Sequence, residues 1–341
     1  MPKISERANE MPVSPIRKLT PLANQAKERG IRVYHLNIGQ PDVPSPPEAF
    51  EALKHIDRKV LEYSPSQGFE SYRKKLVGYY AKYQIELSPE DIIITSGGSE
   101  AVLFAFMSCL NPGDEIIMPE PAYANYMAFA ISAGAKIKTI ATTIEEGFSL
   151  PKVEKFEELI NERTRAILIC NPNNPPGQLT SRELLVQILD KCRLVGAHLL
   201  IDECFMDFVS EEKAFSMRDL LATYPELVIL KAFTKTFAMP GIRLGYCLSG
   251  SSELITALHQ SGQDWNVSIL AQEAGKAALK EHEYLAKSFK LIEQERSYLR
   301  NRLAALGAKV YGSEANYIFF YLPQPENLPE LLHERGYLIR S

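Results

Sequence analysis

The chain has 341 residues, and its content of 45% hydrophobic and 23% charged residues is ordinary for a globular protein. This length is enough for one large α/β domain with a smaller companion. The 38 Lys and Arg residues against 42 Asp and Glu residues give a net charge of −4, so no overall basic field favours nucleic acid as a partner.

The beginning of the chain and its cysteines indicate a cytoplasmic protein. Residues 1–7 contain no apolar signal-peptide core, and the longest apolar stretch, residues 101–110, is too short to span a bilayer, so no membrane association is expected. The five cysteines are scattered and form no C-x-x-C pair, which favours reduced thiols over disulfides or zinc. The six histidines show no metal-ligand spacing, and no metal is predicted.

The first part of the chain is predicted to hold a basic helix over residues 16–30 and a strand over residues 33–38. A proline-rich linker over residues 39–47 follows, and it cannot be regular structure because proline lacks a backbone donor and fixes φ. Pro46 or Pro47 is well placed to open the next helix, which is expected to run through Ala49 and Ile56.

Strand-like and helix-like segments alternate from residue 91 to residue 248, which is typical of a mostly parallel sheet with helices on both faces. Several of these strands are almost wholly apolar, as expected for strands that are buried on both sides. The predicted strands are residues 91–95, 115–118, 136–141, 166–170, 198–202, 228–231 and 243–248. The predicted helices between them are residues 99–110, 123–132, 153–160 and 182–196.

After residue 262 the pattern changes to that of a small α+β domain. The predicted helices there are residues 269–279, 284–306 and 328–335, and the predicted strands are residues 309–311, 317–322 and 337–339.

The most informative feature of the sequence is Lys235, which is followed eight residues later by Arg243. A Pro-Gly break separates the two residues, and an apolar strand is predicted on each side. A lysine among apolar residues can lose its charge and hold an aldehyde as a Schiff base. An arginine in the same pocket can bind a phosphate through its planar guanidinium. An aldehyde and a phosphate together describe pyridoxal phosphate.

Other polar residues follow the predicted strands, and ligands of an open α/β sheet bind at the carboxyl ends of its strands. Residues 95–101 end one strand and open a helix whose amides could hold an anion, although Ser99 would serve equally well as an N-cap. Tyr123 could stack on a pyridine ring or simply pack in the core. Residues 171–177 form either a rigid loop that aims amide side chains at one point or a plain connection.

Asp202 ends an apolar strand, where a buried carboxylate is costly unless it meets a cation. A protonated pyridine nitrogen would be such a cation, and its charge would make the ring an electron sink. A helix cap or an ion pair within the protein is the alternative for Asp202.

Taken together, these residues resemble those of the fold-type-I pyridoxal-phosphate enzymes of the class I/II aminotransferase superfamily, over nearly the whole chain. The resemblance implies an α/β fold whose large domain has a mostly parallel seven-stranded sheet between helices, with a smaller α+β domain. It places the N-terminal arm and part of the small domain in residues 1–45, the large domain in residues 46–262 and the small domain in residues 263–341.

Residue by residue, the resemblance implies Lys235 as the Schiff-base lysine and Asp202 as the partner of the pyridine nitrogen. Tyr123 is expected to stack on the ring, and Asn174 to bond its phenolic oxygen. The phosphate and the rest of the cofactor are expected to be bound by Gly98, Ser99, Glu100, Thr234 and Arg243.

For the substrate and the partner subunit, the resemblance implies three further residues. Gly39 is expected to close over the substrate's carboxylate, beside Asn174, and Arg340 is expected to bind the substrate as well. Tyr63 matches a tyrosine that reaches the phosphate of the neighbouring subunit, so a homodimer is expected.

The implied activity is transfer of an amino group between an amino acid and a keto acid, with Lys235 moving the α-proton. Up to about Cys170 the chain is similar to aspartate-type and aromatic-type aminotransferases. From Asn171 on it is more similar to threonine-phosphate decarboxylases of cobalamin synthesis and their histidinol-phosphate aminotransferase relatives. Decarboxylation of threonine phosphate is therefore the alternative activity, and a hybrid chain joined near residues 171–177 is a further hypothesis.

The chain departs from the family's pattern at three places. Phe205 stands where many members have a tyrosine, and Ala232 stands where a serine is usual. The sequence ends at Ser341, before the arginine that binds the substrate's α-carboxylate in the family, and Arg340 matches a different arginine that binds a substrate phosphate. A truncated chain that binds pyridoxal phosphate with little activity is thus another expectation.

Overall fold

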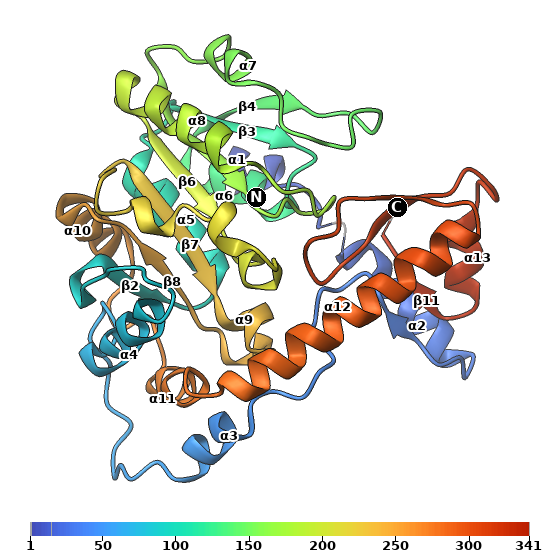
Figure 1. Cartoon of the computed structure of the whole chain (residues 1–341), viewed down its shortest axis with the longest axis horizontal. Helices are drawn as coiled ribbons and strands as arrows, with labels where there is room; N and C mark the ends of the chain where they lie inside the picture. The colour runs from blue at the N-terminus through green and yellow to red at the C-terminus, as the bar shows by residue number, and fades with distance from the viewer. Residues whose placement is uncertain (1, 15, 341) are drawn as a thin grey trace.

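The computed structural model describes residues 2–14 and 16–340. A large body is built around one sheet, and a smaller part lies beside it (Figure 1). The long helix α12 (His282–Ala305) runs from the large body to the smaller part.

The large body contains a seven-stranded sheet with the strand order β2-β8-β7-β6-β5-β3-β4. Its strands are β2 (Ile92–Thr95), β3 (Glu115–Glu120), β4 (Lys136–Ala141), β5 (Thr164–Cys170), β6 (His198–Asp202), β7 (Leu227–Ala232) and β8 (Gly245–Leu248). Strand β8 runs antiparallel to β2 and β7, and the other neighbouring pairs are parallel. The predicted mostly parallel sheet is therefore confirmed. Because β8 is reversed, its first residues lie at the edge where the parallel strands end.

Both faces of the sheet are covered by helices, since successive strand residues point to opposite sides. On one face Ile93 and Leu200 pack with Phe106 of α5 (Gly98–Cys109). On the other face Ile94 and Ile201 belong to a larger cluster, to which several helices contribute. They include α4 (Glu70–Ala81), α8 (Arg182–Val195), α11 (Ile269–Ala278) and α3 (Pro47–Lys54). The remaining helices of the large body are α6 (Ala124–Ala133), α7 (Val153–Glu157) and α10 (Ser252–Ser261).

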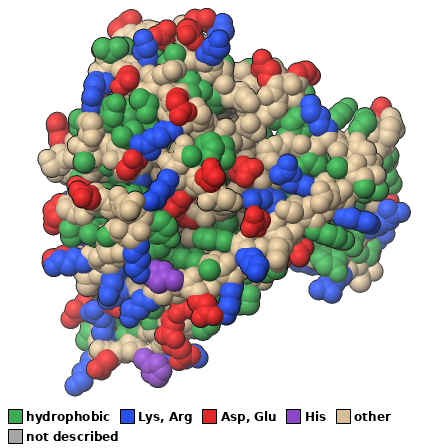
Figure 2. All heavy atoms as spheres, viewed as in Figure 1, with side chains coloured by type: hydrophobic (Ala, Val, Ile, Leu, Met, Phe, Trp, Pro, Cys, Tyr) green, Lys and Arg blue, Asp and Glu red, His purple; other side chains and the backbone are tan. Residues whose placement is uncertain are grey.

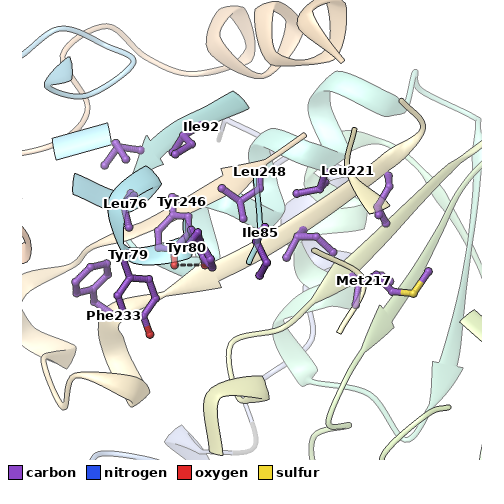
Figure 3. Packing of buried hydrophobic residues seen from close by; sticks show 14 of the residues in the cluster. Leu76, Tyr79, Tyr80, Ile85, Ile92, Met217, Leu221, Phe233, Tyr246 and Leu248 are labelled. Carbon is purple, nitrogen blue, oxygen red and sulfur yellow. Dashed lines mark hydrogen bonds between the residues drawn. The ribbon is translucent and has the colours of Figure 1, made fainter. Parts of the chain in front are cut away.

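Figure 3 shows how α4 is fixed to the sheet in the larger cluster. Leu76, Tyr79 and Tyr80 of α4 lie in this cluster, and the hydroxyl groups of Tyr80 and of Tyr246 in β8 are 2.6 Å apart. Phe233, which follows β7, lies at the same place, so the core extends to the point where β7 ends.

The smaller part joins the two ends of the described chain. Strand β1 (Tyr34–His35) pairs in parallel with β11 (Tyr337–Leu338), and strands β9 (Lys309–Tyr311) and β10 (Phe319–Tyr321) form an antiparallel pair. Helix α2 (Thr20–Glu28) lies beside α13 (Leu328–Glu334), and a short helix α1 (Glu6–Glu10) precedes them. The predicted helix over residues 16–30 is shorter, because Pro21 is tolerated only in a first turn and a 3-10 turn precedes it.

On the face shown in Figure 2, acidic and basic side chains are interspersed. Within residues 2–14 and 16–340, no helix combines the length and apolar character needed to cross a membrane. The same residues contain no group of three or more His, Cys, Asp or Glu side chains arranged to hold a metal ion.

Candidate active site

Lys235 lies in a short helix, α9 (Phe233–Thr236), that directly follows β7. The rings of Phe233 and Phe237 stack with their centroids 4.5 Å apart, and both are buried in the core. These two anchors fix α9 at the carboxyl edge of the sheet. The ammonium group of Lys235 donates a hydrogen bond to the backbone oxygen of Gly39, so the N-terminal segment lies directly against it.

The surroundings of Lys235 favour its neutral form. Burial lowers the pKa of Lys235 to about 8, and the positive charge of Arg340 acts in the same direction. The thiol of Cys204 acts in the opposite direction. Near neutral pH, Lys235 is therefore a free amine in a larger fraction of the molecules than an ordinary lysine would be, and the free amine is the nucleophilic form.

Asp202 is buried at the end of β6 and is held by two hydrogen bonds. Tyr126 donates its hydroxyl to Oδ2 at 2.6 Å, and the backbone N–H of Cys204 donates to Oδ1 at 2.9 Å. Within the described part of the chain, no lysine, arginine or histidine forms a salt bridge with Asp202. This carboxylate is fixed in place and is still able to pair with a cation, such as a protonated pyridine nitrogen.

An anion cradle lies at the join between β2 and α5. Gly97 has φ +90, and a Cβ there would lie 2.7 Å from Nη2 of Arg243. Arg243 itself has φ +55 and donates to the backbone oxygen of Ser96 at 3.4 Å. The predicted strand over residues 243–248 therefore begins only at Gly245, and Arg243 turns back toward the first amides of α5. A guanidinium beside a helix N-terminus is suited to bind a phosphate.

The other predicted phosphate-binding residues surround this cradle. Gly98 is the first residue of α5, so the interpretation of Ser99 as an N-cap is wrong, and Gly97 occupies the cap position. A Cβ on Gly98 would lie 3.3 Å from both the Ala232 side chain and the Cys204 sulfur. Ser99 and Thr234 are half-buried, in the first turn of α5 and in α9 respectively.

Glu100 faces the loop rather than open space. Its Oε2 accepts the backbone N–H of Ser96 at 2.5 Å and the side-chain amide of Asn266 at 2.8 Å. Ser96 also donates its hydroxyl to the backbone oxygen of Asn266 at 2.8 Å. These contacts hold the cradle in shape, so Glu100 supports the loop, and its predicted contact with the cofactor stays a prediction.

Tyr123 is close to several of the predicted site residues. It caps α6, and its ring meets that of Tyr126 edge to face with centroids 5.3 Å apart. Burial raises the pKa of Tyr123, and the charge of Asp202 raises it further, whereas Arg340 and Arg243 act to lower it. The side chains of Asp202, Arg340 and Arg243 therefore all lie near the hydroxyl of Tyr123.

The loop over residues 171–177 is fastened by its own amides. Asn171 accepts the N–H of Thr180 at 3.0 Å, and Asn173 donates its side-chain amide to the backbone oxygen of Pro121 at 3.3 Å. Tyr317 donates its hydroxyl to the backbone oxygen of Asn173 at 2.5 Å. Asn174 is half-buried at the centre of this loop, and its predicted bond to the phenolic oxygen stays a prediction.

Arg340 and Gly39 come to the site together because β1 pairs with β11. Arg340 donates through Nε to the backbone oxygen of Asn37 at 2.8 Å. Burial lowers the pKa of Arg340, and the nearby hydroxyls of Tyr123 and Tyr317 oppose this. The site thus brings together three cationic side chains, those of Lys235, Arg243 and Arg340.

A cluster of buried charged side chains supports the site from below. Asp207 accepts hydrogen bonds from Lys231 at 2.8 Å and from Thr236, the residue after Lys235, at 2.6 Å. Arg218 lies 3.0 Å from Glu203, the residue after Asp202, and 3.6 Å from Asp207. This cluster therefore holds the residue that follows Lys235 and the residue that follows Asp202 in place.

Tyr63 is placed differently. It projects from the surface with 77% of the residue exposed, and its ring stacks on that of Trp265.

Comparisons with known proteins agree with this geometry. The family model described as Aminotransferase class I and II matches residues 31–341. An aspartate aminotransferase of Thermotoga maritima is 30% identical over 325 residues, which covers 93% of this chain and 84% of the relative. A histidinol-phosphate aminotransferase of Carboxydothermus hydrogenoformans is 29% identical and covers 86% of this chain and 79% of the relative. The crystal structure of aspartate aminotransferase from Thermus thermophilus with maleate superimposes with a TM-score of 0.89 at 26% identity, covering 100% of this chain and 92% of that one.

The chain belongs to the class I and II aminotransferases and has their fold-type-I architecture. It is a pyridoxal-phosphate-dependent aminotransferase, and both the predicted activity and the predicted cofactor are confirmed. The alternative of decarboxylation receives no support from these comparisons.

The residues of this chain fit pyridoxal phosphate. The cradle at Gly97 is a space that a Cβ would fill, and Arg243 lies at its edge. Asp202 is a buried carboxylate with no salt bridge to any of the described residues, and an amine of lowered pKa lies at Lys235. Phosphate, pyridine nitrogen and aldehyde each have a complementary group.

Proposed function

We propose that Lys235 holds the aldehyde of pyridoxal phosphate and later moves the proton of the transamination. Bound pyridoxal phosphate supplies an aldehyde that exchanges for the amino group and a ring that withdraws electrons from the substrate's α-carbon. The amine of Lys235 takes the proton from that α-carbon and returns it to the carbon that carried the aldehyde. The lowered pKa of Lys235 is the observation that carries this assignment, because only a neutral amine can accept the proton.

Asp202 and Tyr126 are proposed to keep the ring nitrogen protonated. The hydroxyl of Tyr126 and the N–H of Cys204 donate to the two oxygens of the carboxylate, so Asp202 is held in one orientation. Asn174 donates to the phenolic oxygen, and Tyr123 covers the ring. Gly98, Ser99, Thr234 and Arg243 bind the phosphate.

The substrate is proposed to be a primary amine with an anionic group at its far end, either the side-chain carboxylate of an amino acid or a phosphate. Arg340 is exposed and lies beside Lys235 and Tyr123, where a second anion would find a guanidinium held by its hydrogen bond to Asn37. The relatives support both choices, since they are named for aspartate and for histidinol phosphate. Gly39 and Asn174 are proposed to contact the substrate's own carboxylate.

The enzyme is proposed to act as a homodimer in the cytoplasm. Tyr63 is 77% exposed, and Val60 and Leu61 beside it are 65% and 63% exposed, which is typical of an interaction surface. In the proposed dimer Tyr63 contributes to the phosphate site of the partner subunit. All five cysteines are free, which supports a reducing compartment.

The substrate proposal is tested by incubating the enzyme loaded with pyridoxal phosphate with aspartate, histidinol phosphate or threonine phosphate. We expect formation of the corresponding keto acid from aspartate or threonine phosphate, or of the corresponding keto phosphate from histidinol phosphate, without release of carbon dioxide. In the Arg340→Met variant, loss of a charged hydrogen bond of about 1.5–3 kcal/mol should raise KM for these substrates by about 10-fold or more. Release of carbon dioxide without keto acid would overturn the proposed reaction, and an unchanged KM would overturn the role of Arg340.

A further inference from the structure

The segment that carries Tyr63 is fastened to residues 264–267 of the same chain. Ser64 is buried and donates its hydroxyl to the backbone oxygen of Val267 at 2.6 Å. Ser66 accepts the backbone N–H of Trp265 at 3.1 Å and donates to Asp264 at 3.3 Å. The backbone directly after Tyr63 is therefore held against the backbone around Trp265, and the two side chains extend from this joined base.

The two side chains form one exposed aromatic unit. The rings of Tyr63 and Trp265 stack with centroids 4.5 Å apart and an angle of 24° between their planes. Trp265 is 54% exposed and has φ +57, a left-handed conformation that is unfavourable for a bulky residue. A strained backbone that holds a large exposed ring against another exposed ring points to a function for the pair, since neither ring contributes to the core of its own chain.

We propose that Trp265 is a positioning residue that acts on the active site of the partner subunit, by holding the Tyr63 ring in the direction in which it enters that site. The inference rests on the proposed role of Tyr63 in a homodimer. Without the Trp265 face, the Tyr63 side chain would sample other rotamers at the exposed surface, and binding would have to order it again. The consequence is weaker binding of pyridoxal phosphate at the partner's site.

The same segment also contacts the cradle of its own chain, so the direction of the effect must be tested. The backbone oxygen of Asn266 accepts the hydroxyl of Ser96, and the Asn266 amide donates to Glu100. A change at Trp265 that acted through these bonds would weaken the cofactor site of the same subunit. A change that acted through Tyr63 would weaken only the site of the partner subunit.

Heterodimers in which one subunit carries Lys235→Ala separate the two routes. Only the subunit that keeps Lys235 gives a covalent adduct after borohydride reduction, and the adduct yield against pyridoxal phosphate concentration gives the affinity of that one site. Trp265→Gly is placed either on the subunit without Lys235 or on the subunit that keeps it. Glycine suits the left-handed backbone, so this variant removes the ring without adding strain.

We expect Trp265→Gly to lower the affinity of the partner's site for pyridoxal phosphate by about 3- to 10-fold, which corresponds to the loss of one aromatic pair. The affinity of the site in its own subunit should stay unchanged. Trp265→Phe should restore most of the affinity because it keeps a ring. Tyr298→Ala, which removes another exposed aromatic side chain, is the matched control and should change neither site.

A loss confined to the subunit that carries Trp265→Gly, or no loss in either arrangement, would overturn the inference. Tyr63→Phe in the same two arrangements tests the proposed function separately. If Tyr63→Phe weakens the partner's site and Trp265→Gly does not, only the role of Trp265 fails. If Tyr63→Phe has no effect on the partner's site, or the chains remain monomeric with the cofactor bound, the proposed role of Tyr63 fails as well.

Discussion

Replacement of Gly245 by alanine should damage the phosphate cradle directly. A Cβ on Gly245 would lie 2.6 Å from the carbonyl carbon of Gly97, 2.8 Å from the nitrogen of Gly98 and 2.9 Å from the backbone oxygen of Lys231. All three neighbours are backbone atoms, so no side chain can rotate away. Overpacking of this kind costs about 1–3 kcal/mol, and the loop of Gly97 and Gly98 must shift to relieve it.

The assay has two parts, urea unfolding of the protein without cofactor and titration with pyridoxal phosphate followed by visible absorbance. We expect the Gly245→Ala variant to lose about 1–3 kcal/mol of unfolding free energy and its affinity for the cofactor to fall by about 10-fold or more. The matched control is Gly78→Ala, because a Cβ there meets nothing within 4 Å on the exposed side of α4. That variant should gain about 0.5–1 kcal/mol, as alanine is favoured over glycine in a helix.

The reasoning would be refuted if Gly245→Ala folded with unchanged stability and bound pyridoxal phosphate like the unsubstituted protein. It would also be refuted if Gly78→Ala lost affinity to the same extent, since the loss would then not come from the close contact at the cradle.

Three further predictions concern the groups around the site. The pKa of Lys235 is lowered to about 8, so chemical labelling of this amine in the cofactor-free protein should rise as the pH passes through 8. The unfolding free energy relative to the Lys235→Met variant should also increase with pH above 8, because the unfolded chain then binds more protons than the folded one. Labelling that rises only near pH 10 would contradict this prediction. Tyr126→Phe removes a hydrogen bond to a buried carboxylate and should weaken cofactor binding by about 1.5–3 kcal/mol, measured by the same titration, and an unchanged affinity would exclude Tyr126 as a support for Asp202. Lys231→Met leaves Asp207 without its closest cation and should cost about 3–5 kcal/mol in urea unfolding, whereas a stability loss below about 1 kcal/mol would show that Arg218 and Thr236 suffice.

Most strands of the large sheet could be predicted from the sequence because they are buried on both faces. In the run of residues 198–202, residues 199–201 are apolar and Asp202 follows them, which marks both the strand and its functional edge. The reversed direction of β8 has no such signal, since an apolar run reads the same in a parallel and an antiparallel strand. The sequence identifies Arg243 as a site residue, but it does not predict that Arg243 has a left-handed conformation and lies outside the strand.

Helix α4 is not predicted from the sequence because its buried face is largely made of tyrosines. Tyr72, Leu76, Tyr79 and Tyr80 are buried and follow helical spacing, but charged residues lie between them. The helical period of this segment becomes visible when tyrosine is counted as apolar. Helix α10 (Ser252–Ser261) is not predicted either, although Ser251 caps it through its hydroxyl.

The contacts that complete the site depend on residues far apart in the sequence. Tyr126 lies one turn beyond Tyr123 on α6, yet its partner Asp202 is 76 residues away. Arg340 and Asn37 are 303 residues apart and meet because two-residue strands pair, and strands this short leave no periodic pattern. The sequence therefore predicts the chemical groups at strand ends, whereas their supporting hydrogen bonds follow only from the strand order.

The central claim is that Lys235 holds the cofactor. Reduction of the enzyme loaded with pyridoxal phosphate by borohydride, followed by peptide mapping, tests it most directly. The account predicts loss of the visible absorbance of the bound cofactor and one modified peptide that contains Lys235. A cofactor trapped on another lysine, with Lys235 unmodified, would contradict it.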